Sequence, residues 1–453
     1  MRLSKITYYL LFTLVSVTSL SGCSQDEYAE KQVVEQPKIE AQLILSVSTP
    51  LKGIRAPETT LTGKTTENEC HKLTLFIMNA DGSSIQDYSI EGESLQNKSL
   101  FFNVTTEQGQ KKAFVAVNMT DAQITKIKQA TDHNPAYTID NITDITTENN
   151  FLMTGQVVTE SGSGIINIEA EKTTKVKATL ARVMSKVLLT CTTQDNNEEY
   201  VKLAQDNGYI RLNNVHYILD TTNKKFFPFA KPNNEDPNFN MSETLKTNYA
   251  DNFFAAPFNN TPESGETAVK YDASRMQEGE YQYTEGVYCL ENTINIDLQD
   301  VNRAKNVATY LTINAKFTPK NIDGTKNLSE SDANNKLTKG TFYTCKKAPA
   351  DAKDMCYSTI QKGIDYLKTN YNTNTTNSDF TIHTGGWQYY ETFVNSPTIF
   401  SENAGLVRNN YYIINITSFT APLIEKTIEV NTTICPWNIK GKTTIDIETG
   451  NNK

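Results

Sequence analysis

The chain has 453 residues, with 43 Lys and Arg against 52 Asp and Glu, and a net charge of −9. This acidic balance argues against a nucleic-acid backbone or an anionic membrane surface as partner, and the length favours two domains over one. Hydrophobic residues make up 38% of the chain and charged residues 21%, which is lean for an enzyme but not typical of a disordered chain. The 22 Tyr and 19 Phe, with frequent Thr, Ile and Val, favour a secreted all-β protein.

The first residues have the organisation of an export signal. Arg2 and Lys5 precede an apolar run over residues 6–17, which is too short to cross a membrane as a helix. The letters LSGC, ending at Cys23, follow and resemble a bacterial lipobox. They predict a lipoprotein signal peptide over residues 1–22, lipidation of Cys23, and attachment of the precursor to the outer membrane. A plain signal peptide with a chance cysteine is the alternative.

Apolar and polar residues then alternate along several segments, as in strands with one buried face. In the first segment Leu43, Leu45 and Val47 share one face. Further strands are predicted at residues 73–77, 114–117, 311–317, 412–416, 428–434 and 445–447. Helical spacing occurs at Ile124 and Ile127 and in the stretch 355–371. The pattern predicts an all-β fold of β-sandwiches with a few short helices in loops.

The domain boundary is predicted near residue 178. A Gly/Ser turn at 161–164 and a charged segment at 169–177 precede a new strand-like element over 178–191. We therefore expect the first sandwich to end at 178 and the second to occupy 179–453.

Six cysteines remain besides Cys23, an even number that permits disulfides in an oxidising compartment. Cys345 and Cys356 are the closest pair in sequence and form the candidate disulfide. No C-x-x-C motif supports a zinc ribbon or a redox centre.

The sequence carries no recognisable catalytic motif. The nucleophile-elbow, zincin, P-loop and dinucleotide-binding patterns are all absent from it, and its four histidines are scattered. Structural roles are favoured for these histidines, although folding could still bring a Cys–His pair together. The clusters 195–199 and 321–324 offer oxygen ligands suited to calcium, but such clusters arise freely in an Asn-rich acidic chain. We expect no enzymatic activity, no cofactor and no metal site.

Segments of the last third of the chain resemble, in order, strands of the fimbrillins of Bacteroidales. They are ATYLTINAKFTP at 308–319, GTFY at 340–343, RNNYYIINITSF at 408–419 and IEVNTTICPW at 428–437. The Arg-Asn-Asn-Tyr segment and the one ending in Pro-Trp are the most specific. Weaker likeness extends to residues 151–155 and 181–186, and residues 220–300 match poorly. Within the family, the shaft subunits of the short (minor) fimbriae of Porphyromonas resemble the chain most.

The resemblance implies two transthyretin-like β-sandwiches and removal of the first strand by an arginine-specific protease. In this sequence the cut would fall between Arg55 and Ala56, after a propeptide over residues 23–55 that holds the removable strand. Arg55 is one of seven arginines and has glycine and proline nearby. Pro57 is a departure that slows some proteases. A surface arginine in a linker is the alternative reading.

The resemblance also implies polymerisation by donor-strand exchange, in which a strand of another copy fills the emptied groove. Ile445 and Ile447 alternate correctly for such a donor strand in the tail 443–449, although this tail could instead complete its own sheet. Because the contact is heterologous and does not close, the product would be a surface filament. Further implied partners are anchor, accessory and tip subunits, and host or bacterial surface ligands in adhesion, co-aggregation and biofilm formation.

Two other functions stay open. The chain could be an accessory or tip subunit of the same fimbria. It could also be a glycan-binding surface lipoprotein that uses the aromatic cluster at 387–390 as a stacking platform, although such clusters more often pack in a core.

Overall fold

The chain is mostly β-strand, as the sequence predicts. The structure is a computed structural model, and it describes residues 37–48, 61–62, 65–92, 95, 99–147, 150–195, 197–240, 249–254, 267–268, 286–293, 305–394, 405–420 and 428–438. From Lys38 onward these residues belong to one compact unit. Short helices lie in the connections between strands, so the expected all-β class with a few loop helices is confirmed.

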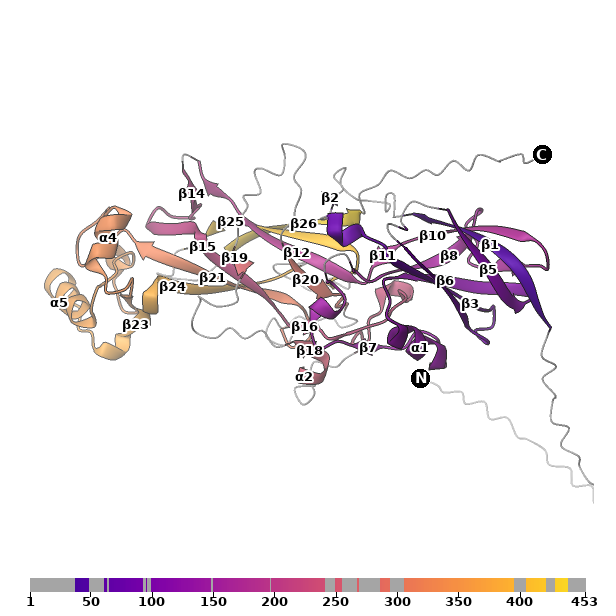
Figure 1. Cartoon of the computed structure of the whole chain (residues 1–453). Coiled ribbons are helices and arrows are strands. Elements are labelled where there is room, and N and C mark those ends of the chain that lie inside the picture. The colour runs from indigo at the N-terminus through magenta and orange to yellow at the C-terminus, as the bar shows by residue number, and fades with distance from the viewer. Residues whose placement is uncertain are drawn as a thin grey trace, which may run out of the picture. The chain divides into compact units, whose positions relative to one another are not determined.

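The first sheet joins strands in the order β4-β3-β6-β8-β10-β1-β5, with β9 paired to β6 and β11 paired to β8 (Figure 1). The strands are β1 Lys38–Ser48, β3 Lys72–Asn79, β4 Gln86–Glu91, β5 Ser99–Glu107, β6 Gly109–Val117, β8 Met153–Thr159, β9 Ile166–Ile168, β10 Thr173–Thr179 and β11 Ala181–Arg182. The end strands β4 and β5 contact each other. The sheet therefore curls around one apolar core to which β1, β3, β5, β6, β8 and β10 all contribute.

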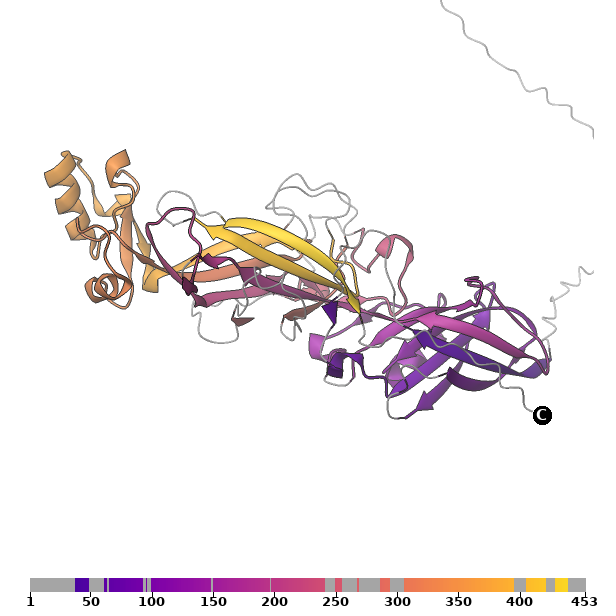
Figure 2. The ribbon, with the colours of Figure 1, turned by 90° about the horizontal axis from the view of Figure 1, so that it is seen from above.

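Two further sheets face each other across a second core. One has the order β2-β26-β25-β12-β20, and β25 and β26 run side by side in Figure 2. The other has the order β13-β14-β15-β21-β24, with β19 paired to β15. The bounds are β2 Leu61–Thr62, β12 Met184–Cys191, β13 Thr193–Gln194, β14 Asn197–Val201, β15 Gly208–Asp220, β19 Thr267–Ala268, β20 Val287–Leu290, β21 Tyr310–Pro319, β24 Trp387–Phe393, β25 Asn410–Phe419 and β26 Ile428–Asn438. Residues of β12, β25, β15 and β21 meet in this core, which makes it a sandwich.

The chain changes from the first sheet to the second sandwich at Val183, because Arg182 still pairs with β8 and Met184 begins β12. β2 is an exception to this division, because Leu61 and Thr62 precede β3 in sequence but pair in parallel with the end of β26 in the second sandwich. The segment that follows β1 in sequence thus reaches the second sandwich before the chain returns to the first sheet at β3. The division into domains at residue 178 stays a prediction.

Smaller elements fill the connections. Three two-stranded sheets join β7 Tyr137–Thr138 to β17 Lys225–Phe226, β16 Thr222–Asn223 to β18 Phe253–Phe254, and β22 Phe342–Cys345 to β23 Phe380–His383. In the described ranges the helices are α1 Asp121–Gln129, α2 Tyr249–Asn252, α4 Glu330–Lys336 and α5 Ile360–Tyr371, and the 3-10 turns are η1 Thr65–Asn68, η2 Ile142–Asp144, η3 Pro232–Asn234, η6 Ala350–Ala352, η7 Asn377–Asp379 and η8 Thr384–Gly386. Residues 320–386, inserted between the paired strands β21 and β24, form an extension with its own small core.

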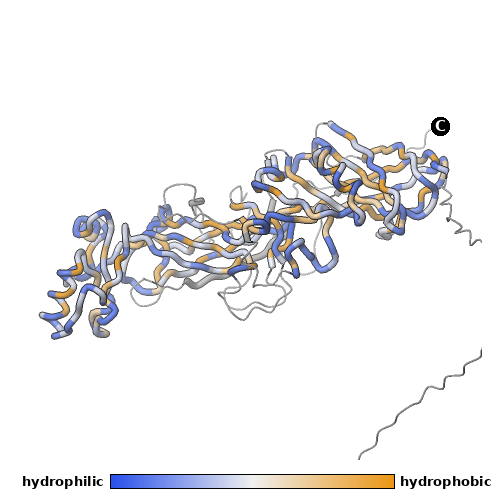
Figure 3. Tube along the Cα trace, turned by 90° about the horizontal axis from the view of Figure 1, so that it is seen from below, coloured by the Kyte–Doolittle hydropathy of each residue, from blue (hydrophilic) through white to orange (hydrophobic). Residues whose placement is uncertain are grey.

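Local sequence accounts for the two longer helices. The Thr120 hydroxyl accepts the amide of Gln123 in a capping box at the start of α1, and Ile124 and Ile127 are buried as their spacing predicts. At the start of α5 the Thr359 hydroxyl accepts the amide of Lys362 as a simple N-cap. In Figure 3 apolar and polar residues alternate along the strands, as expected when one face of each sheet packs on a core. None of the helices in the described ranges is long and apolar enough to span a bilayer.

Candidate functional site

The first strand occupies a fully paired position inside the first sheet. β1 runs parallel to β10, with Leu45 opposite Val176, and antiparallel to β5, with Leu45 opposite Leu100. Both edges of β1 therefore carry ladder hydrogen bonds. β1 precedes β5 and β10 in the sequence, yet in the sheet it lies between them (Figure 1).

The predicted inward face of β1 is confirmed. Leu43, Leu45 and Val47 are 1%, 0% and 3% exposed, and Ala41 shares their face. All four belong to the core of the first sheet. Burial of the three larger side chains contributes about 1.5–3 kcal/mol each before ordering costs. Loss of β1 would therefore expose an apolar groove between β10 and β5.

The segment after β1 is held by a buried ion pair. The Nζ of Lys186 in β12 lies 2.8 Å from Oε1 of Glu67 in η1, and both side chains are fully buried. The Tyr288 hydroxyl also donates to Glu67, and Lys186 Nζ sits 5.0 Å from the centre of the Tyr288 ring. Burial, and then the negative charge of Glu67, raises the pKa of Tyr288 far above its usual range. The phenol is therefore a hydrogen-bond donor at neutral pH.

Arg182 extends this buried polar group. Its Nε donates to the main-chain carbonyl of Glu67 at 3.3 Å, its guanidinium also donates to the side-chain oxygen of Asn68, and its own amide donates to Asn409 Oδ1 at 3.1 Å. Burial is the main cause that lowers the pKa of Arg182 to about 10, and Glu67 opposes it. We call Glu67, Asn68, Arg182, Lys186 and Tyr288 the Glu67 cluster. It fixes η1 against the second sandwich.

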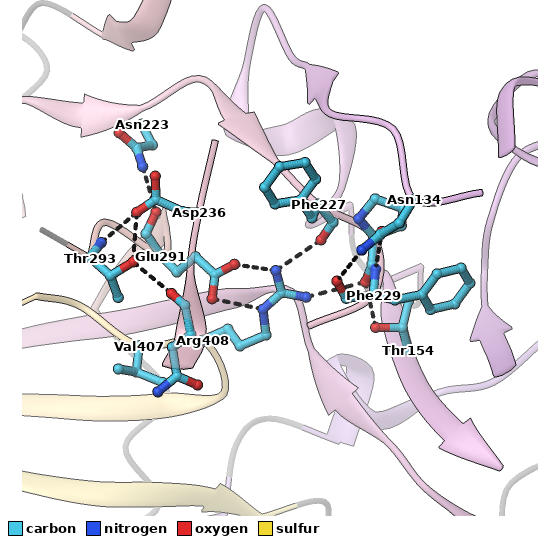
Figure 4. A network of polar contacts seen from close by, with 12 residues as sticks. Asn134, Thr154, Asn223, Phe227, Phe229, Asp236, Glu291, Thr293, Val407 and Arg408 are labelled. Atoms are coloured by element: carbon cyan, nitrogen blue, oxygen red, sulfur yellow. Dashed lines mark hydrogen bonds and ion pairs between the residues drawn. The ribbon is translucent and has the colours of Figure 1, made fainter. Parts of the chain in front are cut away.

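A second buried ion pair lies close to the first sheet (Figure 4). Arg408 Nε donates to Glu291 Oε2 at 2.8 Å, and the other guanidinium nitrogens donate to the carbonyls of Phe227 and Pro228 at 2.8 and 3.1 Å. The same Pro228 carbonyl accepts the hydroxyl of Thr154 in β8 at 2.6 Å. One carbonyl thus joins the second sandwich to the first sheet.

Asp236 adds a buried carboxyl to this network (Figure 4). It accepts the Thr293 amide and hydroxyl at 2.5 and 2.9 Å, and the Asn238 amide at 2.6 Å. Burial, only partly offset by these donors and reinforced by the charge of Glu291, raises the pKa of Asp236 to about 7. Sequence reasoning missed this group, because nothing local distinguishes Asp236 from the many other carboxylates.

The structure gives the motif Arg-Asn-Asn-Tyr a physical role that its sequence did not reveal. Arg408 donates hydrogen bonds to Glu291, and Asn409 accepts the main-chain amide of Arg182. The Tyr411 ring lies 5.5 Å from Lys186 Nζ. The four-residue motif therefore contributes to both buried ion-pair clusters.

Several predicted site residues lie outside the described residues. These are the lipidation position Cys23, the cleavage positions Arg55 and Ala56, and the donor positions Ile445 and Ile447.

The candidate disulfide between Cys345 and Cys356 is wrong, because both are free thiols. Tyr343 and Tyr357 form an antiparallel bridge, and this register places Thr344 opposite Cys356. Cys345 is one residue out of phase, so the two side chains point to opposite faces. Cys356 packs in the sandwich core, while Cys345 packs in the separate core of the extension.

The calcium clusters and the histidines have structural partners. Asp323 is bound by the Ser358 amide and hydroxyl at 2.9 and 2.7 Å and by Lys362 Nζ at 2.9 Å. Glu199 pairs with Arg211. Among the residues that the structure describes, no group of three His, Cys, Asp or Glu side chains could hold a metal ion. The four histidines contact Glu69, the Ile127 carbonyl, the Trp387 ring, and Thr344 with Gln388.

The aromatic cluster at 387–390 is divided between two faces of β24. Tyr390 is buried and its ring lies 5.2 Å from that of Phe419, whereas Tyr389 is 37% exposed. The Trp387 ring lies 5.8 Å from the His216 ring. The three aromatic rings of this segment therefore do not form one flat surface.

Comparison with known proteins adds distant likenesses. No family model matches the chain, and no curated protein matches it. A solved fimbrilin from Porphyromonas gingivalis is 14% identical, with a TM-score of 0.44, over 89% of this chain and 99% of that one. A candidate cell adhesion protein from Parabacteroides distasonis is 13% identical, with a TM-score of 0.47, over 88% and 100%. The tip fimbrial protein Mfa3 of P. gingivalis is 13% identical, with a TM-score of 0.39, over 88% and 100%. At TM-scores below 0.5 these likenesses establish neither family nor function.

Proposed function

We propose that the chain is a structural subunit of cell-surface fimbriae, exported as a lipoprotein and polymerised by donor-strand exchange. The observation that carries this proposal is the position of β1, an N-terminal strand paired on both edges whose inward aliphatics complete a core. The resemblance to fimbrillins and their two transthyretin-like sandwiches supports it. In this proposal the protein is a shaft subunit like that of the short fimbriae of Porphyromonas.

The proposed cleavage after Arg55 is supported by the three arginines that the structure describes. Arg182 and Arg408 are buried and hydrogen-bonded, and Arg211 contacts Glu330 through two nitrogens. Burial and bonding protect these three from a protease. Arg55 belongs to the connection between β1 and β2, which reach different sheets.

The Glu67 cluster supports the idea that cleavage releases only β1. The cut would separate residues 38–48 from η1, which stays fixed to β12 by the Lys186–Glu67 pair. The rest of the chain would keep its own cores. The groove could then accept a strand of a second copy, with residues 443–449 as the proposed donor.

N-terminal sequencing of the surface-assembled protein tests this proposal. A shaft subunit should begin at Ala56, and Arg55→Ala should leave the precursor uncut and unpolymerised. Arg211→Ala is the matched control and should be processed normally. A surface form that begins at Cys23 would contradict strand exchange.

The accessory or tip subunit is separated from the shaft subunit by deleting the residues after Thr443. A shaft subunit should then lose polymerisation, whereas a tip subunit should still be incorporated. A glycan-binding lipoprotein is favoured by no specific observation, since the aromatic cluster at 387–390 is split between two faces.

A further inference from the structure

β5 forms one wall of the position that β1 occupies. In the described part of the chain, its only ladder partner is β1, in a register that runs from Lys38 opposite Glu107 to Ser46 opposite Ser99. Loss of β1 would therefore remove the backbone hydrogen bonds that align β5 with the sheet. A groove with an unaligned wall is a poor template for an incoming strand.

One side chain contacts the other edge of β5. The hydroxyl of Tyr88, on β4 at the opposite end of the sheet order, donates to the Thr105 carbonyl at 2.7 Å and accepts the Thr105 amide at 3.0 Å. Successive residues of a strand direct their backbone groups to opposite edges, so those of Thr105 point away from β1. Both contacts therefore remain when β1 leaves.

The Tyr88 ring is itself held in place. It packs half-buried against the core of the first sheet, opposite Leu75 in the pairing of β4 with β3. Burial raises the pKa of the phenol, so its hydroxyl can act as both donor and acceptor at neutral pH. At the hairpin end of β5, Glu107 accepts from Asn79 at 2.9 Å. Tyr88 thus adds a contact to the backbone of β5 itself.

We propose that Tyr88 is a positioning residue that keeps β5 in place after β1 is removed, so that the groove stays open for a strand that runs parallel to β10 and antiparallel to β5. This inference rests on the proposed function and names the residue that prepares its acceptor site. A wall that is already aligned saves the incoming strand the entropy cost of ordering it. Two backbone contacts of this kind correspond to about tenfold in affinity.

The test uses the full chain cut at Arg55 with an arginine-specific protease and freed of the β1 fragment in mild urea. Wild type is compared with Tyr88→Phe, and with Tyr137→Phe as a control, because the Tyr137 hydroxyl donates to the Gln123 carbonyl outside the groove. Hydrogen exchange of residues 99–107 is followed before and after β1 is removed. Binding of a labelled peptide of residues 37–48 is measured in parallel.

For Tyr88→Phe we expect β5 to exchange faster only after β1 is removed, and the peptide to bind about tenfold more weakly, with Tyr137→Phe like wild type. Thr105→Pro removes the amide that donates to the Tyr88 hydroxyl, so it should also speed exchange of β5 and weaken peptide binding. This variant replaces Tyr88→Phe if that one does not fold. Equal exchange of β5 in wild type and in the variants overturns the role of Tyr88. A wild-type groove that does not take up the peptide overturns strand exchange instead, and the exchange data still decide the role of Tyr88.

Discussion

The ion pair between Glu67 and Lys186 allows a sharp test of how the segment after β1 is held. Glu67→Gln keeps the shape of the side chain but leaves the Lys186 ammonium buried without its carboxylate. The two groups are 2.8 Å apart and both are fully buried, so water cannot replace the lost partner. Removal of one member of such a pair costs about 3–5 kcal/mol.

Urea unfolding of the full chain measures this cost. Trp387 and Trp437, the two tryptophans of the sequence, lie in β24 and β26 and report on the second sandwich. Circular dichroism follows the whole chain in the same samples. Glu67→Gln should lower the free energy of unfolding, and the transition seen by tryptophan fluorescence should move to lower urea.

Two controls separate charge burial from packing. The double variant Glu67→Gln with Lys186→Met removes the unpaired ammonium but leaves the buried Arg182 guanidinium without the charge of Glu67, so it should recover part of the lost stability. Glu169→Gln removes an exposed pair with Lys172 and should leave unfolding unchanged. The reasoning would be refuted if Glu67→Gln cost less than about 1 kcal/mol, or if the double variant were no more stable than the single one.

Three further outcomes are expected. Asp236 keeps its proton in the folded chain up to a pKa of about 7, whereas the unfolded chain releases it near pH 4. The free energy of unfolding should therefore fall by about 4 kcal/mol as the pH rises from about 4 to about 7. Asp236→Asn should flatten this pH dependence, measured by urea unfolding. Leu45→Ala should destabilise the uncut chain by about 2–5 kcal/mol but leave the chain stripped of β1 unchanged, and an equal effect on both forms would contradict the removable strand. Alkylation in denaturant without reductant should label both Cys345 and Cys356. If neither cysteine were labelled, the two would be joined in a disulfide after all.

The sequence predicted the features that depend on neighbouring residues. Period-two alternation identified β1 and its inward residues Leu43, Leu45 and Val47, because successive side chains of a strand point to opposite faces whatever lies beside them. The spacing of Ile124 and Ile127 identified α1 for the same kind of reason. These signals lie within a few residues and survive in any tertiary context.

Other features required partners that are distant in sequence. Alternation predicts one buried face for β3, yet its residues Leu73 to Met78 are all buried, because the ring of Phe76 packs on that of Phe229 at 5.8 Å. The Cys345 pairing failed because a register shift of one residue reverses a side chain, and short sequence separation carries no information on register.

The sequence by itself determined the all-β class and the buried face of the first strand. Only the tertiary structure decided that β1 is enclosed between β10 and β5, and that Glu67 meets Lys186 across 119 positions of the chain. A charged side chain has no local signature of burial, since its cost is offset only by partners that folding brings to it. For that reason the two buried ion-pair clusters, and the hold of Tyr88 on β5, could be found only in the folded chain.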